Sequence, residues 1–87
     1  MERANMIKVE YKDITESTNQ YLNLKDYPYS TIGCYYVGQY IGYIGWSKEN
    51  EQYMFFPYNE QQLMFDYSIL YSIANQISIL MKDRMLS

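Results

Sequence analysis

The stretch NEQQLMFDYSILYSIANQISILMKDR, from Asn59 to Arg84, decides the fold class of this chain. Its apolar residues recur at alternating steps of four and three, which is the spacing of one face of an α-helix. The stripe consists of Leu63, Tyr67, Leu70, Ala74, Ile77 and Met81, widened by Ile73 and Leu80. No Gly or Pro interrupts the stretch. The spacing therefore predicts a helix over residues 59–84, with Leu70, Ile73 and Ile77 facing the core.

Both ends of this stretch carry side chains that helix termini favour. Asn59 is placed to cap the first turn, and Gln62 lies where a capping box has Glu or Gln. Glu60 suits the positive end of the helix dipole, and Lys82 and Arg84 suit the negative end. Three apolar residues fall off the main stripe, where they either widen the core-facing side or form a second interface: Phe65, Ile69 and Ile79.

Residues 31–56, which precede this helix, have the pattern of a β-meander. Three short runs rich in β-branched and aromatic residues predict strands: Ile32–Val37, Tyr40–Trp46 and Gln52–Phe56. Gly38-Gln39 has the Gly-first order of a type II′ hairpin turn. Residues 47–51 read as a polar turn, and Pro57 ends the third strand because it cannot donate to the ladder.

The pairing that follows from this turn leaves apolar residues on both faces of the hairpin. Three pairs lie on the face of Trp46: Val37 with Tyr40, Tyr35 with Gly42, and Gly33 with Ile44. The other face carries Tyr36 with Ile41, Cys34 with Tyr43, and Ile32 with Gly45. One helix covers only one face of a small sheet. The second face must therefore meet the segment 12–30, another copy of the chain, or a partner.

The N-terminal part adds one more strand. Residues 1–5 are polar and are expected to fray, and Met6 to Tyr11 alternates as a half-buried strand at an edge of the sheet does. Residues 12–30 allow either a short helix begun by Ser17 and Gln20 or a polar loop, and we prefer the loop. The sequence thus predicts a single α+β domain, with an antiparallel sheet of three or four strands and one long C-terminal helix packed on one face.

Composition limits the classes of function. The chain has 87 residues, enough for one domain, and Tyr supplies 12 of them, which suits interfaces because the ring is apolar and its tip polar. The net charge is −3 and no basic run is present, so binding to a nucleic-acid backbone is disfavoured. No apolar run approaches the roughly 20 residues that cross a bilayer, and the first ten residues lack the core of a signal peptide. We therefore expect a cytoplasmic protein.

Residues for catalysis are scarce. The chain has no His, which is the commonest general base and metal ligand. Cys34 is its only cysteine and lies in a predicted strand without a base to activate it, so a buried structural thiol is favoured over a nucleophile. Glu49 and Glu51 lie in a turn, where solvation is favoured over acid–base chemistry. The sequence predicts no enzymatic activity, no metal and no cofactor.

The rings of the meander are the candidate binding residues: Tyr35, Tyr36, Tyr40, Tyr43, Trp46 and Tyr53. They resemble a stacking platform for bases, but such platforms pair with a basic groove that this sequence lacks. We interpret about half of the rings as core and the exposed remainder as a protein interface. The glycines Gly33, Gly38, Gly42 and Gly45 lack the strand–loop–helix setting of a phosphate-binding loop.

The order of strand, hairpin, Phe56-Pro57 and a helix carrying Leu70, Ile73, Ile77 and Leu80 resembles that of small uncharacterised phage and prophage proteins. The resemblance spans roughly the last 55 residues, from Gly42 onward in its clearest part, and transfers no functional residue. Phage proteins of this size include inhibitors of host defence such as anti-CRISPR proteins. The resemblance implies the same role here, in the cytoplasm of the host cell.

The function we expect is that of a non-enzymatic protein that binds a host protein through its Tyr-rich surface. A first alternative is a sponge or sensor for a small nucleotide-like ligand held at an oligomer interface. A second is a small DNA-binding accessory regulator, against which the missing basic patch counts. An apolar sheet face left in water would also favour a homodimer, most simply a two-fold one.

Overall fold

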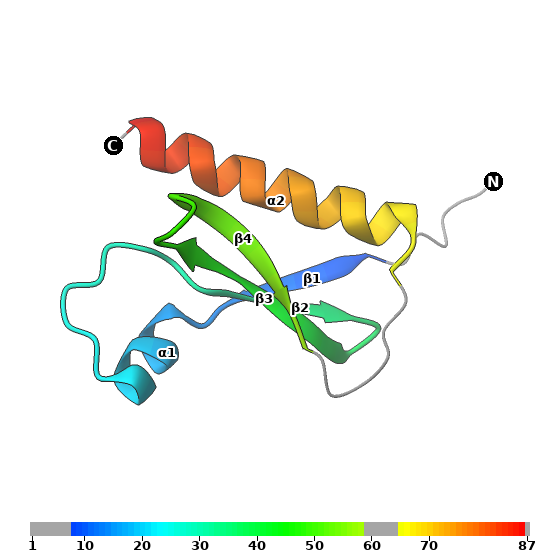
Figure 1. Ribbon diagram of the computed structural model, residues 1–87. Coiled ribbons are helices and arrows are strands. Elements are labelled where there is room, and N and C mark those ends of the chain that lie inside the picture. Colours follow the sequence, from blue (N-terminus) through cyan, green and yellow to red (C-terminus); the bar gives the residue numbers. More distant parts are fainter. Residues whose placement is uncertain (1–7, 59–64, 87) are drawn as a thin grey trace.

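The computed structural model describes residues 8–58 and 65–86 of the chain. Four antiparallel strands form a sheet in chain order, and a C-terminal helix packs on one face of it (Figure 1). The elements are β1 (Val9–Asp13), α1 (Thr15–Leu22), β2 (Ile32–Tyr36), β3 (Gln39–Ser47), β4 (Gln52–Pro57) and α2 (Tyr67–Leu86). The predicted α+β class, with a small antiparallel sheet and one long C-terminal helix, is confirmed.

The strands lie close to where the apolar patterns place them. β2 and β4 differ from the predicted strands by one residue at one end, and β3 by one residue at each end; β4 stops at Pro57. β1 forms an edge of the sheet as expected, but it runs from Val9 to Asp13 rather than from Met6 to Tyr11. Residues 6 and 7 lie outside the described residues. The connections from β2 to β3 and from β3 to β4 are short because each of these strands pairs with the next one along the chain, whereas the connection from β1 to β2 contains α1.

The hairpin turn between β2 and β3 differs from the prediction. Val37 and Gly38 form the turn, with φ angles of 52° and 75°, and positive φ at both central residues is typical of a type I′ turn. Tyr36 therefore pairs with Gln39 and Tyr35 with Tyr40. The predicted type II′ turn at Gly38-Gln39, with Val37 opposite Tyr40, is wrong.

A β-bulge shifts the register further along the same hairpin. Tyr35 pairs with Tyr40 but Cys34 pairs with Gly42, so Ile41 is an additional residue on β3. The predicted pairs Tyr35 with Gly42 and Gly33 with Ile44 are therefore wrong. As a result of the bulge, Ile41 and Ile44 both point into the core under α2, with exposed fractions of 3% and 0%.

Helix α2 begins later than predicted. Phe65 and Asp66 precede the helix, and the Asp66 carboxylate accepts a hydrogen bond of 3.0 Å from the backbone N–H of Ile69, as an N-cap does. The predicted continuous helix from residue 59 is therefore wrong at its start. The predicted caps Asn59 and Gln62 lie outside the described residues. Arg84 lies in the last turn, where a cation is favourable.

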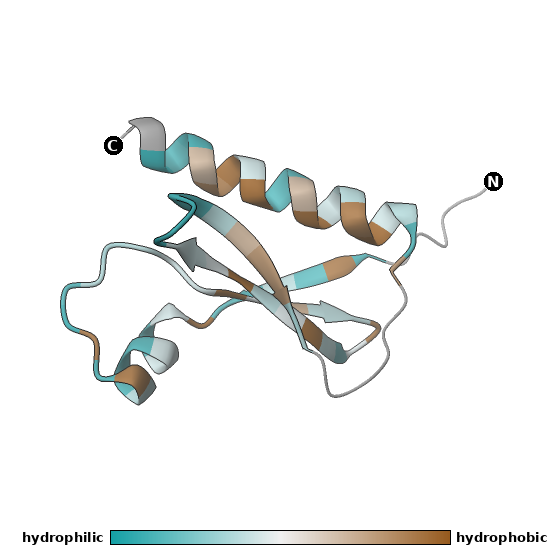
Figure 2. Cartoon of the chain, viewed as in Figure 1, coloured by the Kyte–Doolittle hydropathy of each residue, from teal (hydrophilic) through white to brown (hydrophobic). Residues whose placement is uncertain are grey.

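The face of α2 that meets the sheet is offset from the predicted stripe. Ile69 and Ile73 are each 4% exposed, and Ile77 packs against the core beside them. Leu70 is 51% exposed, so the prediction holds for Ile73 and Ile77 and is wrong for Leu70. Figure 2 shows the strongly hydrophobic residues of α2 gathered toward the sheet. Burial of the isoleucine stripe removes purely aliphatic surface from water, whereas the alternative stripe would bury the hydroxyl of Tyr67.

The segment 12–30 lies against the other face of the sheet and contains a helix, so the preferred loop prediction is wrong for residues 15–22. Before α1, Asp13 accepts hydrogen bonds from the backbone and side chain of Thr15, which lower the pKa of its carboxyl. Ile14 N–H donates to the Thr31 carbonyl at 2.9 Å and ties the start of α1 to the residue before β2. Asn23, in the left-handed conformation, ends the helix.

Truncation of a buried isoleucine of α2 tests the observed face. Ile69→Ala or Ile73→Ala should lower the free energy of unfolding by about 2–5 kcal/mol, because each leaves a cavity in the core. Leu70→Ala should cost less than about 1 kcal/mol in dilute solution, since half of this side chain is already in water. Urea denaturation measures all three variants, and equal losses would contradict the observed face.

The hairpin turn offers a stabilising substitution. Val37 adopts a left-handed conformation that costs a β-branched residue about 1–2 kcal/mol, and its side chain is 70% exposed. Val37→Asn creates the Asn-Gly pair that type I′ turns prefer. We expect the melting temperature to rise by a few degrees, which corresponds to about 1 kcal/mol. A lower melting temperature would argue for the type II′ turn instead.

Candidate functional site

The structure divides the six candidate binding residues between the two faces of the sheet. Three lie on the face that α2 covers: Tyr36, Trp46 and Tyr53. The other three lie on the opposite face: Tyr35, Tyr40 and Tyr43. The predicted hairpin had Tyr35 and Tyr40 on the same face as Trp46, and Tyr43 on the same face as Tyr36. Because of the bulge, Tyr35, Tyr40 and Tyr43 instead share one face, and Tyr36 and Trp46 share the other. The six rings do not form one surface.

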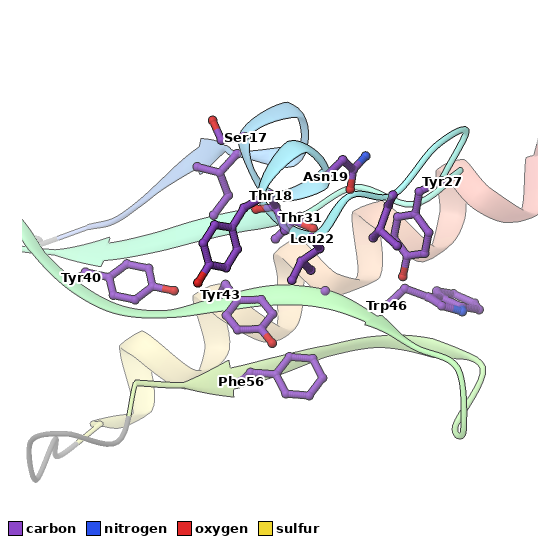
Figure 3. A pocket seen from close by; sticks show the side chains of 14 residues that line it. Ser17, Thr18, Asn19, Leu22, Tyr27, Thr31, Tyr40, Tyr43, Trp46 and Phe56 are labelled. Atoms are coloured by element: carbon purple, nitrogen blue, oxygen red, sulfur yellow. The ribbon is translucent and has the colours of Figure 1, made fainter.

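A groove of about 710 Å³ lies between the segment of α1 and the outer face of β3 and β4 (Figure 3). Its strand side is aromatic and consists of Tyr40, Tyr43 and Phe56. Its helix side carries Ser17, Thr18, Asn19 and Leu22. Leu24 and Tyr27, which follow α1, complete that side, and Trp46 lies at one end. The segment 12–30 therefore covers the second face only in part.

The aromatic floor of the groove depends on glycine. The rings of Tyr43 and Phe56 stack with centroids 4.9 Å apart and planes at 21°. A Cβ at Gly45 would lie 3.1 Å from the Tyr43 ring, so glycine there lets this ring lie close to the sheet. The floor continues through Tyr40, and the centroids of the Tyr40 and Tyr58 rings are 5.5 Å apart. Tyr43 is nevertheless 37% exposed, which leaves its ring available for contact.

Asn19 is the polar feature of the helix side. Its carboxamide oxygen is buried and, among the described residues, has no hydrogen-bond partner. Figure 3 shows this oxygen turned toward the groove and the amide nitrogen turned outward. A buried acceptor without a donor costs about 1–3 kcal/mol. A ligand that brings an N–H or O–H group to this position would recover that free energy.

The groove carries no charge. None of the residues that line it is acidic or basic. Burial raises the pKa of the Tyr40 hydroxyl above its ordinary value of 10.0, and burial also raises the pKa of Tyr27. Both phenols are therefore neutral at physiological pH. An uncharged surface of rings and hydroxyl groups suits an apolar or aromatic ligand.

A second aromatic cluster joins the end of α2 to the sheet. Tyr29 stacks on Trp46 with centroids 4.2 Å apart and planes at 6°. The Arg84 guanidinium lies 4.4 Å from the centre of the Tyr29 ring and donates to its hydroxyl at 3.0 Å. Tyr53 accepts a hydrogen bond from the Ser30 backbone at 3.1 Å. These contacts are internal, so we assign Trp46 and Tyr53 a mainly structural role.

Cys34 lies at the centre of the core and is fully buried. Burial raises the pKa of its thiol to about 11, which is opposite to the shift that activates a nucleophile. Among residues 8–58 and 65–86, no group of three His, Cys, Asp or Glu side chains could hold a metal ion. Over the same residues, neither helix combines the length and hydrophobicity that crossing a bilayer requires.

Comparison of this chain with protein families, with curated proteins and with solved structures gives no match. The assignment of a function therefore rests on the geometry of the groove.

Several residues of this groove were not predicted from the sequence. Phe56, Asn19, Leu22 and Tyr27 were not among the candidate binding residues, although they line it with Tyr40, Tyr43 and Trp46. The apolar second face of the hairpin already indicated segment 12–30 as one of three alternative covers. A helix reading of that segment would have placed Leu22 over the strands.

The thiol of Cys34 should be inert in the folded protein. At pH 8 a thiol of pKa about 11 is ionised to roughly one part in a thousand, and the surrounding core excludes reagents. Alkylation by iodoacetamide, followed by mass spectrometry, should be undetectable in buffer and complete in denaturant. Cys34→Ala should keep any binding activity. Rapid labelling of the native protein would contradict this burial.

Proposed function

We propose that this chain is a non-enzymatic binding protein that accommodates an apolar segment of a partner protein in the groove between α1 and the outer face of the sheet. The observation that carries the proposal is the groove itself, with its aromatic floor, its volume of about 710 Å³ and its uncharged lining. Tyr and Trp dominate protein interfaces because they supply large rigid contact areas with polar tips.

The free-energy balance supports an apolar partner segment. Contact with Tyr43, which is 37% exposed, and Leu22, which is 54% exposed, would remove apolar surface from water. Because the lining is uncharged, this burial desolvates no ion. The unpartnered oxygen of Asn19 would in addition gain a donor, such as a backbone N–H of the segment. The burial of apolar surface and the hydrogen bond to Asn19 thus both favour an apolar segment of a protein as the occupant of the groove.

The biological role within this proposal is inhibition of a host protein. A phage-encoded inhibitor of a defence system, such as an anti-CRISPR protein, would act in the host cytoplasm by occupying a surface of its target. This part of the proposal rests on the resemblance of the strand order, Phe56-Pro57 and the following helix to small phage proteins. The groove supports binding and does not bear on the identity of the target.

A second candidate is a sponge or sensor for a planar small molecule. The stacked pair of Tyr43 and Phe56 favours it, as does a volume within the range of about 300–1,000 Å³ for ligand sites. A base could stack on such rings. The lining has no cation to pair with a phosphate, so a neutral base or nucleoside would suit the groove better than a nucleotide.

Variants on the two sides of the groove test the proposal. Leu22→Asp and Tyr43→Ala should each weaken binding of a captured host protein about 30-fold, which corresponds to the ~2 kcal/mol of an interface hot spot. The control is Val37→Asp, which makes the same type of change at an exposed apolar residue in the hairpin turn. Affinity capture from host lysate identifies the partner, and titration with that protein gives the affinities.

The outcomes separate the two candidates. A stoichiometric protein retained by the wild type and by Val37→Asp, but lost from both groove variants, supports the protein-binding function. An ultraviolet-absorbing molecule that is released on denaturation and lost from Tyr43→Ala supports the small-ligand function instead. A partner that binds both groove variants with unchanged affinity would contradict the groove as the site.

A further inference from the structure

The strand β1 forms an edge of the sheet and offers backbone groups to a further strand. It pairs with β2 alone, and no other described strand lies beside it. The Ile14 N–H donates to the Thr31 carbonyl, so Ile14 is one of the residues whose backbone groups point toward β2. Because this direction alternates along an antiparallel strand, the N–H and C=O groups of Val9, Tyr11 and Asp13 point away from the sheet. We call this side of β1 the free edge.

The opposite edge of the sheet, at β4, is poorly suited to pairing with another strand. The Tyr53 N–H donates to the Met81 sulfur of α2 at 3.4 Å. Pro57, at the end of β4, has no N–H to donate. Sheets are commonly blocked in these ways, because unpaired backbone groups at an edge recruit other chains. β1 contains no proline, so its free edge keeps all of its donors.

The charged side chains of β1 are arranged symmetrically about Tyr11. Glu10 precedes this residue and Lys12 follows it, and both are exposed. The Tyr11 hydroxyl contacts Ser72 of α2 at 2.6 Å, so Glu10 and Lys12 lie on the opposite face of the sheet. In an antiparallel pair of β1 strands centred on Tyr11, Glu10 of each copy therefore lies directly opposite Lys12 of the other, on the same face.

This register matches both the hydrogen bonds and the charges. With Tyr11 opposite Tyr11, Val9 lies opposite Asp13, so the backbone groups at the free edge of one strand meet those of the other. The two neighbouring registers oppose like charges. A centre at Glu10 pairs two carboxylates, and a centre at Lys12 pairs two ammonium groups, and like charges directly opposite one another destabilise a strand pair.

We propose that β1 pairs with β1 of a second copy, antiparallel about a two-fold axis at Tyr11, so that the two four-stranded sheets join into one. A second copy fits better than an unrelated strand, because one symmetry operation aligns the free backbone groups and both charge pairs. The two Tyr11 rings become neighbours across the axis, and aromatic cross-strand pairs are stabilising. The groove lies over β3 and β4, on the far side of β2, so the proposal is independent of the proposed function.

Charge reversal at the free edge tests the proposal. The wild type should change from monomer to dimer with rising concentration in sedimentation equilibrium. Glu10→Lys and Lys12→Glu should each weaken the dimer about 10-fold, because each places like charges opposite one another at two positions. Both changes in one chain restore the two pairs and should recover the wild-type affinity. Glu49→Lys and Lys48→Glu are matched controls at exposed residues of the turn between β3 and β4, and they should dimerise like the wild type.

Mixing of variants tests the register. An equimolar mixture of Glu10→Lys and Lys12→Glu chains should form the heterodimer in preference to either homodimer, because only the heterodimer opposes unlike charges. Glu10→Cys mixed with Lys12→Cys should form a disulfide on mild oxidation, because the two positions form a non-hydrogen-bonded pair, in which side chains are closest. Glu10→Cys alone should cross-link far less, since its two copies are offset along the strands. Cys34 does not interfere because it is fully buried.

Three results would overturn the proposal. The first is a wild type that stays monomeric up to the millimolar range. The second is a dimer as tight in Glu10→Lys and Lys12→Glu as in the wild type, which would place the interface elsewhere. The third is a dimer in which the mixed cysteine variants fail to cross-link, which would exclude this register. Leu22→Asp should still dimerise, so a failure of the groove as a binding site is distinguishable from a failure of this proposal. Circular dichroism should show folded protein for every variant, because Glu10 and Lys12 are exposed.

Discussion

The β-bulge in the hairpin of β2 and β3 is the feature on which the rest of the structure depends. Without it, Ile32 would pair with Tyr43, and this ring would point into the core while Ile44 faced the groove. The extra residue Ile41 reverses this arrangement. It requires glycine at position 42, where φ is 148° and a Cβ would overlap the carbonyl oxygen of Phe56. A single inserted residue therefore decides that Ile44 faces the core under α2 and that Tyr43 faces the groove.

The two faces then differ in how completely they exclude water. Under α2, aliphatic side chains such as Ile44 and Ile73 are almost fully buried, and β1 is joined to the helix by the hydrogen bond of 2.6 Å between Tyr11 and Ser72. On the opposite face, α1 has no buried residue, and the Tyr43 ring below it remains partly in water. Stability is concentrated on the first face, so binding of the proposed partner on the second face would cost the fold little.

Local patterns in the sequence predict the elements of this fold and fail where two patterns compete. The strands and the C-terminal helix follow from alternation and from helical spacing, and both are found. A bulge produces no repeating pattern in the sequence, and Gly42 is equally compatible with a residue that relieves crowding. The bulge was therefore not predicted, and the residues were assigned to the wrong faces of the sheet. Likewise α1 has few apolar residues, and its N-cap residue Ile14 makes no side-chain cap hydrogen bond. The polar sequence of this segment therefore favoured the prediction of a loop. The groove depends on both features, and hence only Tyr40, Tyr43 and Trp46 of its residues were predicted.

The prediction of the buried face of α2 was wrong for Leu70 for a physical reason. This helix carries two overlapping apolar stripes, one through Ile69 and Ile73 and the other through Tyr67, Leu70 and Ala74. Helical spacing identifies both but cannot assign either to the core of its own chain. A chain of 87 residues has a thin core, and small domains commonly gain stability by association. The aliphatic stripe meets the sheet, and the second stripe carries Tyr hydroxyls, which can form hydrogen bonds with water at the surface.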